Sequence, residues 1–129
     1  MRRTLPFEII IAPGNTPGAA AGNGLVINRL GYRSVKIGLA AATVAASSSI
    51  VAKIQHGDES DGSDMADFKP DGDVISTGTL STSNTNSSVD VDLSGAKKYI
   101  RIVTTTTGTA PSFSTYAALG DRAYEENFN

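Results

Sequence analysis

The 129-residue chain lacks cysteine and tryptophan altogether and contains a single histidine. The absence of cysteine excludes disulfide frameworks, thiol nucleophiles, cysteine-ligated zinc and iron–sulfur clusters. With four Phe and four Tyr residues as its other aromatics, the chain offers few surfaces on which nucleic-acid bases or sugars could stack. One histidine supplies little for a histidine-based metal site. These absences exclude thiol chemistry and cysteine-ligated metals, and they give little support to a histidine-based metal site.

Clustered positive charge is also scarce. The net charge is −2 and the sequence pI is about 5.2. Adjacent basic residues occur only at Arg2-Arg3 and Lys97-Lys98. Because phosphate backbones are bound by clustered lysine and arginine, we expect no nucleic-acid partner.

Long apolar runs are missing as well. The uncharged stretch between Lys36 and Lys53 consists mostly of Ala, Ser, Gly and Thr. It is too short and too polar for a transmembrane helix, which needs about 20 predominantly apolar residues. The basic start of the chain is not followed by an apolar stretch long enough for a signal peptide before Pro13. We therefore expect a soluble protein with no membrane partner.

What the chain has in abundance is Ser and Thr, 27 residues together, and Gly, 13 residues. Thr and Val fit pleated strands, whereas Gly, Ser, Asn and Asp fill turns, so this composition favours an all-β fold. The length corresponds to one domain that can bury a sizeable core without a disulfide or a metal.

Hydrophobic residues alternate with polar or small ones along several segments, which is the pattern of half-buried strands. This alternation on both flanks of the alanine cluster at residues 40–42 favours two strands, joined around residues 45–49, over a helix. The strand cores are Val35, Ile37 and Leu39; Ile50, Ala52 and Ile54; Val89, Val91 and Leu93; Ile100 and Ile102 within residues 98–109; and residues 112–119.

The remaining segments are expected to be short strands or irregular structure. They are two short strands at residues 7–11 and from residue 25, a Gly/Pro-rich loop or arm at 12–24, an acidic loop at 58–73, a weak strand at 74–80 and a polar turn at 81–88. Together these patterns predict an all-β fold: a single β-sandwich or jelly roll of about 7–8 short antiparallel strands. We assign residues 1–24 to an N-terminal strand and extended arm, 25–119 to the sandwich core and 120–129 to a polar tail.

Residues 53–68, KIQHGDESDGSDMADF, hold the only histidine and several carboxylates, so any catalytic or metal site is expected here. His56 precedes Asp58 and Glu59, but a strand end entering a loop is a poor place to fix the geometry that a general base requires. We interpret His56 as a solvated polar residue at the end of a strand.

The same stretch does not match a calcium-binding EF-hand loop. Reading from Asp58 or from Asp61, the third ligand position is occupied by Gly62 or Met65. Calcium binding by the acidic loop at 58–73 remains an alternative, and the prediction is that its charges only solvate the loop. Elsewhere, no G-x-S-x-G motif occurs, and Gly14–Gly18 lacks the lysine of a phosphate-binding loop. We predict no catalytic, cofactor or metal residues and no enzymatic activity.

Two segments carry a resemblance to a known family. Residues 53–68 are similar to the pattern lqhSDDGSxFtdv found in small proteins encoded in the structural regions of tailed phages and prophages. SGAKKYIRIVTTTTGTAPSFSTYAALGD, residues 94–121, is similar to the pattern aGkkrYlRvvvtvtGtspsfsvaAvlG that follows in those proteins. The matched region runs from about Ser34 to Gly120 and leaves out the N-terminal arm.

This resemblance implies a bacteriophage virion protein, made in the host cytoplasm and located on the capsid surface. It implies a capsid decoration (cement) protein with a jelly-roll core, whose partners are the major capsid protein and copies of itself in a homotrimer. The alternatives are a tail or baseplate component with the same core, or a carbohydrate- or cell-surface-binding module.

Overall fold

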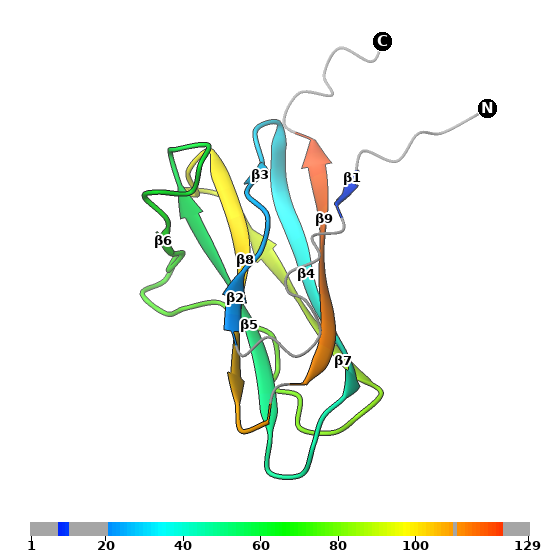
Figure 1. Ribbon diagram of the computed structural model, residues 1–129. Coiled ribbons are helices and arrows are strands. Elements are labelled where there is room, and N and C mark those ends of the chain that lie inside the picture. Colours follow the sequence, from blue (N-terminus) through cyan, green and yellow to red (C-terminus); the bar gives the residue numbers. More distant parts are fainter. Residues whose placement is uncertain (1–7, 11–20, 110, 123–129) are drawn as a thin grey trace, which may run out of the picture.

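The computed structural model describes residues 8–10, 21–109 and 111–122 of the chain. In chain order the strands are β1 (Glu8–Ile10), β2 (Ala21–Asn23), β3 (Ile27–Asn28), β4 (Tyr32–Thr43), β5 (Ser49–Gly57), β6 (Ala66–Asp67), β7 (Thr85–Asp92), β8 (Tyr99–Thr107) and β9 (Ser112–Arg122). They form two antiparallel sheets that lie face to face (Figure 1). The predicted all-β sandwich is confirmed, with nine strands because four of them have only two or three residues.

The two sheets divide the strands unequally. The four-stranded sheet has the order β1-β9-β4-β7, and the five-stranded sheet has the order β2-β8-β5-β6 with β3 also paired to β8. The connections β4–β5, β7–β8 and β8–β9 each cross from one sheet to the other, so sequence neighbours face each other across the core. No helix in the described ranges is long and apolar enough to cross a membrane.

The core fills the space between the sheets, and strand alternation determines which residues reach it. Val35, Ile37 and Leu39 of β4 are almost fully buried, and so are Ile50 and Ile54 of β5. The alternation predicted for these strands, and for β7, β8 and β9, is therefore confirmed. Further members of this cluster include Ala52, Val91, Leu93, Ile100, Ile102, Phe113, Ala117 and Leu119.

The edge of β5 that faces away from β8 is covered by residues 66–80, which follow β5 in the chain. Phe68 N and Thr77 N donate to carbonyl groups of β5, and Leu80 exchanges two backbone hydrogen bonds with Ile50. Residues 74–80, predicted as a weak strand, thus form isolated bridges with β5 at Ser76 and Leu80 instead of a continuous strand. The predicted acidic loop at 58–73, in turn, contains the two-residue strand β6. Both differences from the prediction arise because these segments pair with the edge of β5.

Three other boundaries differ from the prediction for the same reason. Residues 21–23, assigned to the arm, pair with β8, and residues 85–88, assigned to a polar turn, pair with β4 as part of β7. The last strand continues past the predicted start of the tail as far as Arg122. Residues 12–20 of the predicted arm and 123–129 of the predicted tail lie outside the described residues.

Two connections at one end of the sandwich contact each other. Gly108, between β8 and β9, has a φ angle of 80°, in the left-handed region that favours glycine. Its neighbour Thr109 donates its backbone N–H to Ser48 Oγ at 2.9 Å. A Cβ at position 108 would lie 2.7 Å from this oxygen and 2.8 Å from the Ser47 carbonyl oxygen, so only glycine fits here.

Gly108→Ala is expected to destabilise the protein more than Gly95→Ala. Gly95 has a similar φ of 84°, but no atom lies within 4 Å of the place that an added methyl group would take, so its replacement costs about 1–2 kcal/mol from the backbone conformation alone. At Gly108 the backbone must also shift, and we expect a total loss above about 3 kcal/mol. Urea unfolding of the two variants measures the difference; equal losses would contradict the close contact.

Candidate functional site

The acidic loop between β5 and β6 is held by its own carboxylates. Asp64 accepts hydrogen bonds from the backbone N–H of Asp58 at 2.9 Å and of Glu59 at 3.1 Å. Asp61 accepts one from Ser63 N at 2.9 Å. The prediction that these charges only solvate the loop is therefore wrong for Asp61 and Asp64. Each carboxylate satisfies N–H groups that the irregular backbone leaves unpaired.

These hydrogen bonds also set the ionisation of the loop. The N–H groups of Asp58 and then Glu59 hold the pKa of Asp64 below its usual value, and the N–H of Ser63 does the same for Asp61. Asp58 forms an ion pair with Lys97 at 3.5 Å, linking the loop to the β7–β8 turn. Among the described residues, no group of three or more His, Asp or Glu side chains is placed to hold a metal ion.

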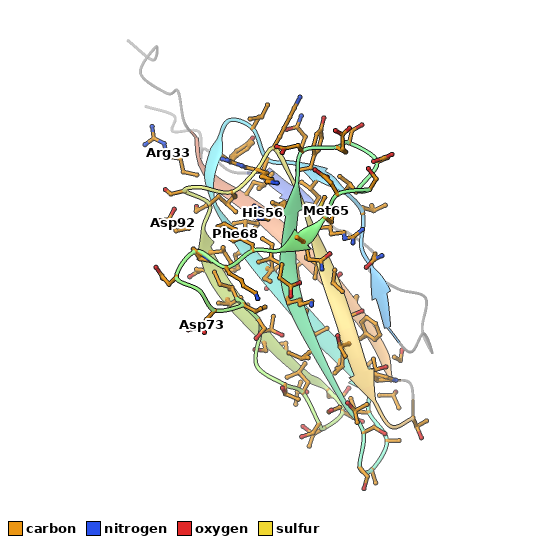
Figure 2. The ribbon with its side chains drawn as sticks, turned by 90° about the vertical axis from the view of Figure 1, so that its left-hand side faces the viewer. Arg33, His56, Met65, Phe68, Asp73 and Asp92 are labelled. Carbon is orange, nitrogen blue, oxygen red and sulfur yellow. The ribbon has the colours of Figure 1, made fainter. Side chains whose placement is uncertain are left out.

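His56 lies at the end of β5 and packs against Phe68, with ring centroids 4.9 Å apart (Figure 2). Its Nδ1 accepts a hydrogen bond from Lys97 N at 3.1 Å, so this nitrogen carries no proton. Burial, and then the positive charge of Lys97, lower the pKa of His56, while Asp58 opposes them. No carboxylate of the described residues hydrogen-bonds to the ring. The neutral ring holds a turn in place, which differs from the solvated residue that the sequence suggested.

The same turn is fixed from its other side by Arg29. The guanidinium donates to Lys97 O at 2.9 Å and also to the carbonyl oxygen of Ala96. His56, Arg29 and Asp58 thus all contact the turn at residues 96–97.

A row of polar side chains crosses the outer face of the five-stranded sheet. Asp67 of β6 accepts from Lys53 and from Gln55 Nε2, both at 2.9 Å, and Gln55 Oε1 accepts from Arg101 Nε at 3.0 Å. The lysine and then the glutamine lower the pKa of Asp67. The row links three strands through mutually satisfied groups, which stabilise the sheet.

The outer face of the four-stranded sheet has a different character. On β4 and β9 its outward residues are nearly all small; we call them the small-residue face: Ser34, Gly38, Ala40, Ala42, Ser114, Ala118 and Gly120. Lys36 of β4 also faces outward here, and the other large side chain is that of Tyr116. It pairs with Gly38, where an added Cβ would lie 2.0 Å from the Tyr116 ring, so the ring occupies the space above this glycine.

Two shallow hollows lie on this face, one on each side of the Gly38–Tyr116 pair. The first, about 370 Å³, is bordered by Lys36 and Asp90, which form an ion pair at 2.9 Å. The second, about 330 Å³, is bordered by Ala40, Ala42 and Ser114. Small side chains therefore form most of this face, and the charge of Lys36 on it is paired with Asp90.

Sequence reasoning did not identify this face. The alternation of small residues at 38, 40 and 42 and at 114, 118 and 120 was the available signal. It gained meaning only when the pairing of β4 with β9 placed both sets side by side.

A third hollow, of about 410 Å³, lies between the end of β7 and the segment that covers β5. Asp71 and Asp92 border it, and Figure 2 shows Asp73 on the same side of the sandwich. Ser94 N donates to Asp92 Oδ1 at 2.9 Å, and this hydrogen bond lowers the pKa of Asp92. Like the acidic loop, this carboxylate stabilises a turn.

No protein-family model matches the chain, and no curated protein matches its sequence. Among solved structures, the chain is similar to the SPBc2 prophage-derived protein YomS, with a TM-score of 0.51 and 11% identity, over 92% of this chain and 97% of that one. A chain of the disulfide-linked pili of Bacillus endospore appendages has a TM-score of 0.46 and 9% identity, over 92% of this chain and 88% of that one. The first similarity shows a shared fold.

Acidification is expected to weaken the fold through His56. Because the pKa of the folded histidine lies below its usual value near 6.5, folding favours the neutral ring. The stabilisation is complete above that value and is lost as the pH falls from it toward the folded pKa. His56→Gln should flatten the pH dependence of the unfolding free energy between pH 8 and 5.5. Parallel curves for the two proteins would contradict this role.

Asp64→Ala is expected to loosen the acidic loop without unfolding the sandwich. It removes the acceptor for two backbone N–H groups, so amide hydrogen exchange at Asp58 and Glu59 should accelerate while exchange in β5 and β8 stays unchanged.

Adding calcium should leave the melting temperature of the unmodified protein unchanged. A calcium-dependent rise that disappears when Asp58, Asp61 and Asp64 are replaced by Asn would show a metal site instead.

Proposed function

We propose that the chain is a non-enzymatic structural protein of a bacteriophage virion, and specifically a capsid decoration protein that bridges major capsid subunits. Its fold, shared with a prophage-derived protein, is consistent with this role. So is the resemblance of residues 53–68 and 94–121 to small proteins of phage structural regions.

One structural observation carries the proposal. The first and last described strands, β1 and β9, pair side by side, and Glu8 lies opposite Leu119. Because the strands are antiparallel, β1 begins where β9 ends, so both chain ends are attached to the same end of a rigid sandwich (Figure 1). Two adjacent terminal segments suit a protein that contacts more than one neighbour.

The chemistry of these segments supports contacts with protein surfaces. The segment before β1 contains Arg2 and Arg3, and the segment after β9 contains Glu125 and Glu126. Segments of opposite charge attached to one place can recognise different patches on adjoining capsid subunits. A homotrimer on a threefold or quasi-threefold axis multiplies such contacts, so that weak individual contacts give strong binding.

The described side chains also favour a contact role over catalysis. His56, Asp58, Asp61 and Asp64 all use their polar groups to hold turns. No buried side-chain nitrogen or oxygen among the described residues is left without a partner, so no such group awaits a ligand.

Particles made without this chain are expected to lose heat and osmotic tolerance, and added protein should restore both. Cryo-electron microscopy of the restored particles should show density for the sandwich on the shell. Removing residues 1–7 and 123–129 should abolish restoration while the circular dichroism spectrum keeps its strand signal. Density on a tail or baseplate, or saturable binding on a glycan array without binding to shells, would establish one of the alternatives.

A further inference from the structure

The edges of the two sheets differ in how well they are covered. Residues 66–80 cover β5, while β2 and β3 cover β8. By contrast, no segment in the described part of the chain pairs with the outer side of the eight-residue strand β7. An edge strand of this length presents alternate N–H and C=O groups to a further strand, and proteins normally protect such edges.

The opposite edge of the same sheet, β1, is complementary to β7 in direction. Along the order β1-β9-β4-β7 every neighbouring pair is antiparallel, so β1 and β7 also run in opposite directions. A rotation about an axis parallel to the strands keeps every strand direction. Therefore β7 of one copy would lie antiparallel to β1 of the next copy around such an axis, as strand pairing requires.

The two edges also lie at the same height along the strands. Through its pairing with β9 and β4, Ile9 lies in one row with Ala118, Lys36 and Asp90. Glu8 lies in the row of Val91, so its position would be opposite Val91 of the next copy and not opposite Asp90. A ring of copies can thus close by rotation alone, without a shift along the axis.

The small-residue face determines how many copies fit. A four-stranded sheet is about 19 Å wide at about 4.8 Å per strand, so three sheets forming a triangular prism lie about 5.5 Å from its axis. Sheets packed face to face are about 10 Å apart, which puts each about 5 Å from the middle. Three sheets therefore reach packing distance at the axis, provided that their facing side chains are small. Four sheets would lie about 10 Å from the axis and leave a channel.

We propose that three copies surround a threefold axis parallel to the strands, with their small-residue faces packed around it and β7 of each copy antiparallel beside β1 of the next. The proposal deepens the decoration function, from which the trimer comes, by naming the surfaces that form it. The Tyr116 rings, each above its Gly38, meet near the axis. Lys36, on the central strand β4, faces the axis as well, and its ammonium group forms an ion pair with Asp90 of the edge strand β7, nearer the corner where water has access.

The absence of native cysteine allows a direct test of this register. The double variant Ile9→Cys, Asp90→Cys places thiols on the two edges in the same row. Oxidation should convert most of the protein into a covalent trimer, three times 13.3 kDa, on a non-reducing gel. The control pair is Ile9→Cys, Asn86→Cys, because Asn86 lies four residues along β7 from Asp90, about 13 Å away. It should stay uncrosslinked.

A second pair of variants tests the face itself. Ser114→Arg puts a long charged side chain on the small-residue face, and Thr105→Arg makes the same change at an exposed position on the outer face of the other sheet. In light scattering of the purified protein, Ser114→Arg should lower the mass about threefold, from trimer to monomer. Thr105→Arg should leave the trimer intact, and circular dichroism should show both variants folded.

The remaining outcomes overturn the arrangement. They are an unmodified protein that is monomeric or dimeric, a cysteine pair that yields no covalent trimer or an open series of larger polymers, or a Ser114→Arg variant that stays trimeric. Failure of the decoration function is separate. A correctly crosslinked trimer that does not bind particles would refute the function alone, whereas a monomer that binds and protects particles would refute this interface alone.

Discussion

The packing of two inner sheet faces against each other is the constraint on which the rest of this structure depends. Ile37 and Leu39 on one sheet and Ile50 and Ile54 on the other are almost completely removed from water. Each fully buried side chain of this size contributes about 1.5–3 kcal/mol relative to an exposed one. Because β4, β5, β7, β8 and β9 all supply this core, and consecutive ones cross between the sheets, the core fixes where every connection must run.

The acidic stretch shows what happens to polar residues in such a fold. The chain must leave β5, turn and return to cover its edge, which breaks regular backbone pairing. Asp61 and Asp64 replace the missing acceptors, and His56 accepts from the turn on the opposite connection. Residues 53–68 have the composition of a catalytic or metal site, but their polar groups order the acidic loop and the β7–β8 turn. Residues 53–68 are informative about the fold because so many of their polar groups stabilise it.

The two outer faces differ in a way that the core does not impose. One carries long polar side chains joined in a hydrogen-bonded row, as expected for a face in water. The other carries glycine, alanine and serine around Tyr116 and Lys36, beside the edge strand β7, whose outer side pairs with no described strand. Small outward residues contribute little to the stability of one copy and permit close approach by another protein. The proposed trimer would account for this asymmetry.

The sequence by itself determined the fold class and most of the long strands. Hydrophobic residues recur at every second position in Val35–Leu39, Ile50–Ile54 and Ile100–Ile102, which indicates strands buried on one side. This pattern can be read from the sequence because it depends only on neighbouring residues. The sequence also excluded thiol chemistry, because that needs a residue the chain does not have.

Only the tertiary structure decided which strands share a sheet, that residues 21–23 and 85–88 are strands, and which partners His56 and Asp64 have. Lys97 N lies 41 residues from His56, and β4 lies about 80 residues from β9 along the chain. Short polar segments become strands only when an edge supplies their hydrogen bonds, and no local pattern contains that edge. The small-residue face arose in the same way, from two separate alternations that became one surface when β4 and β9 paired.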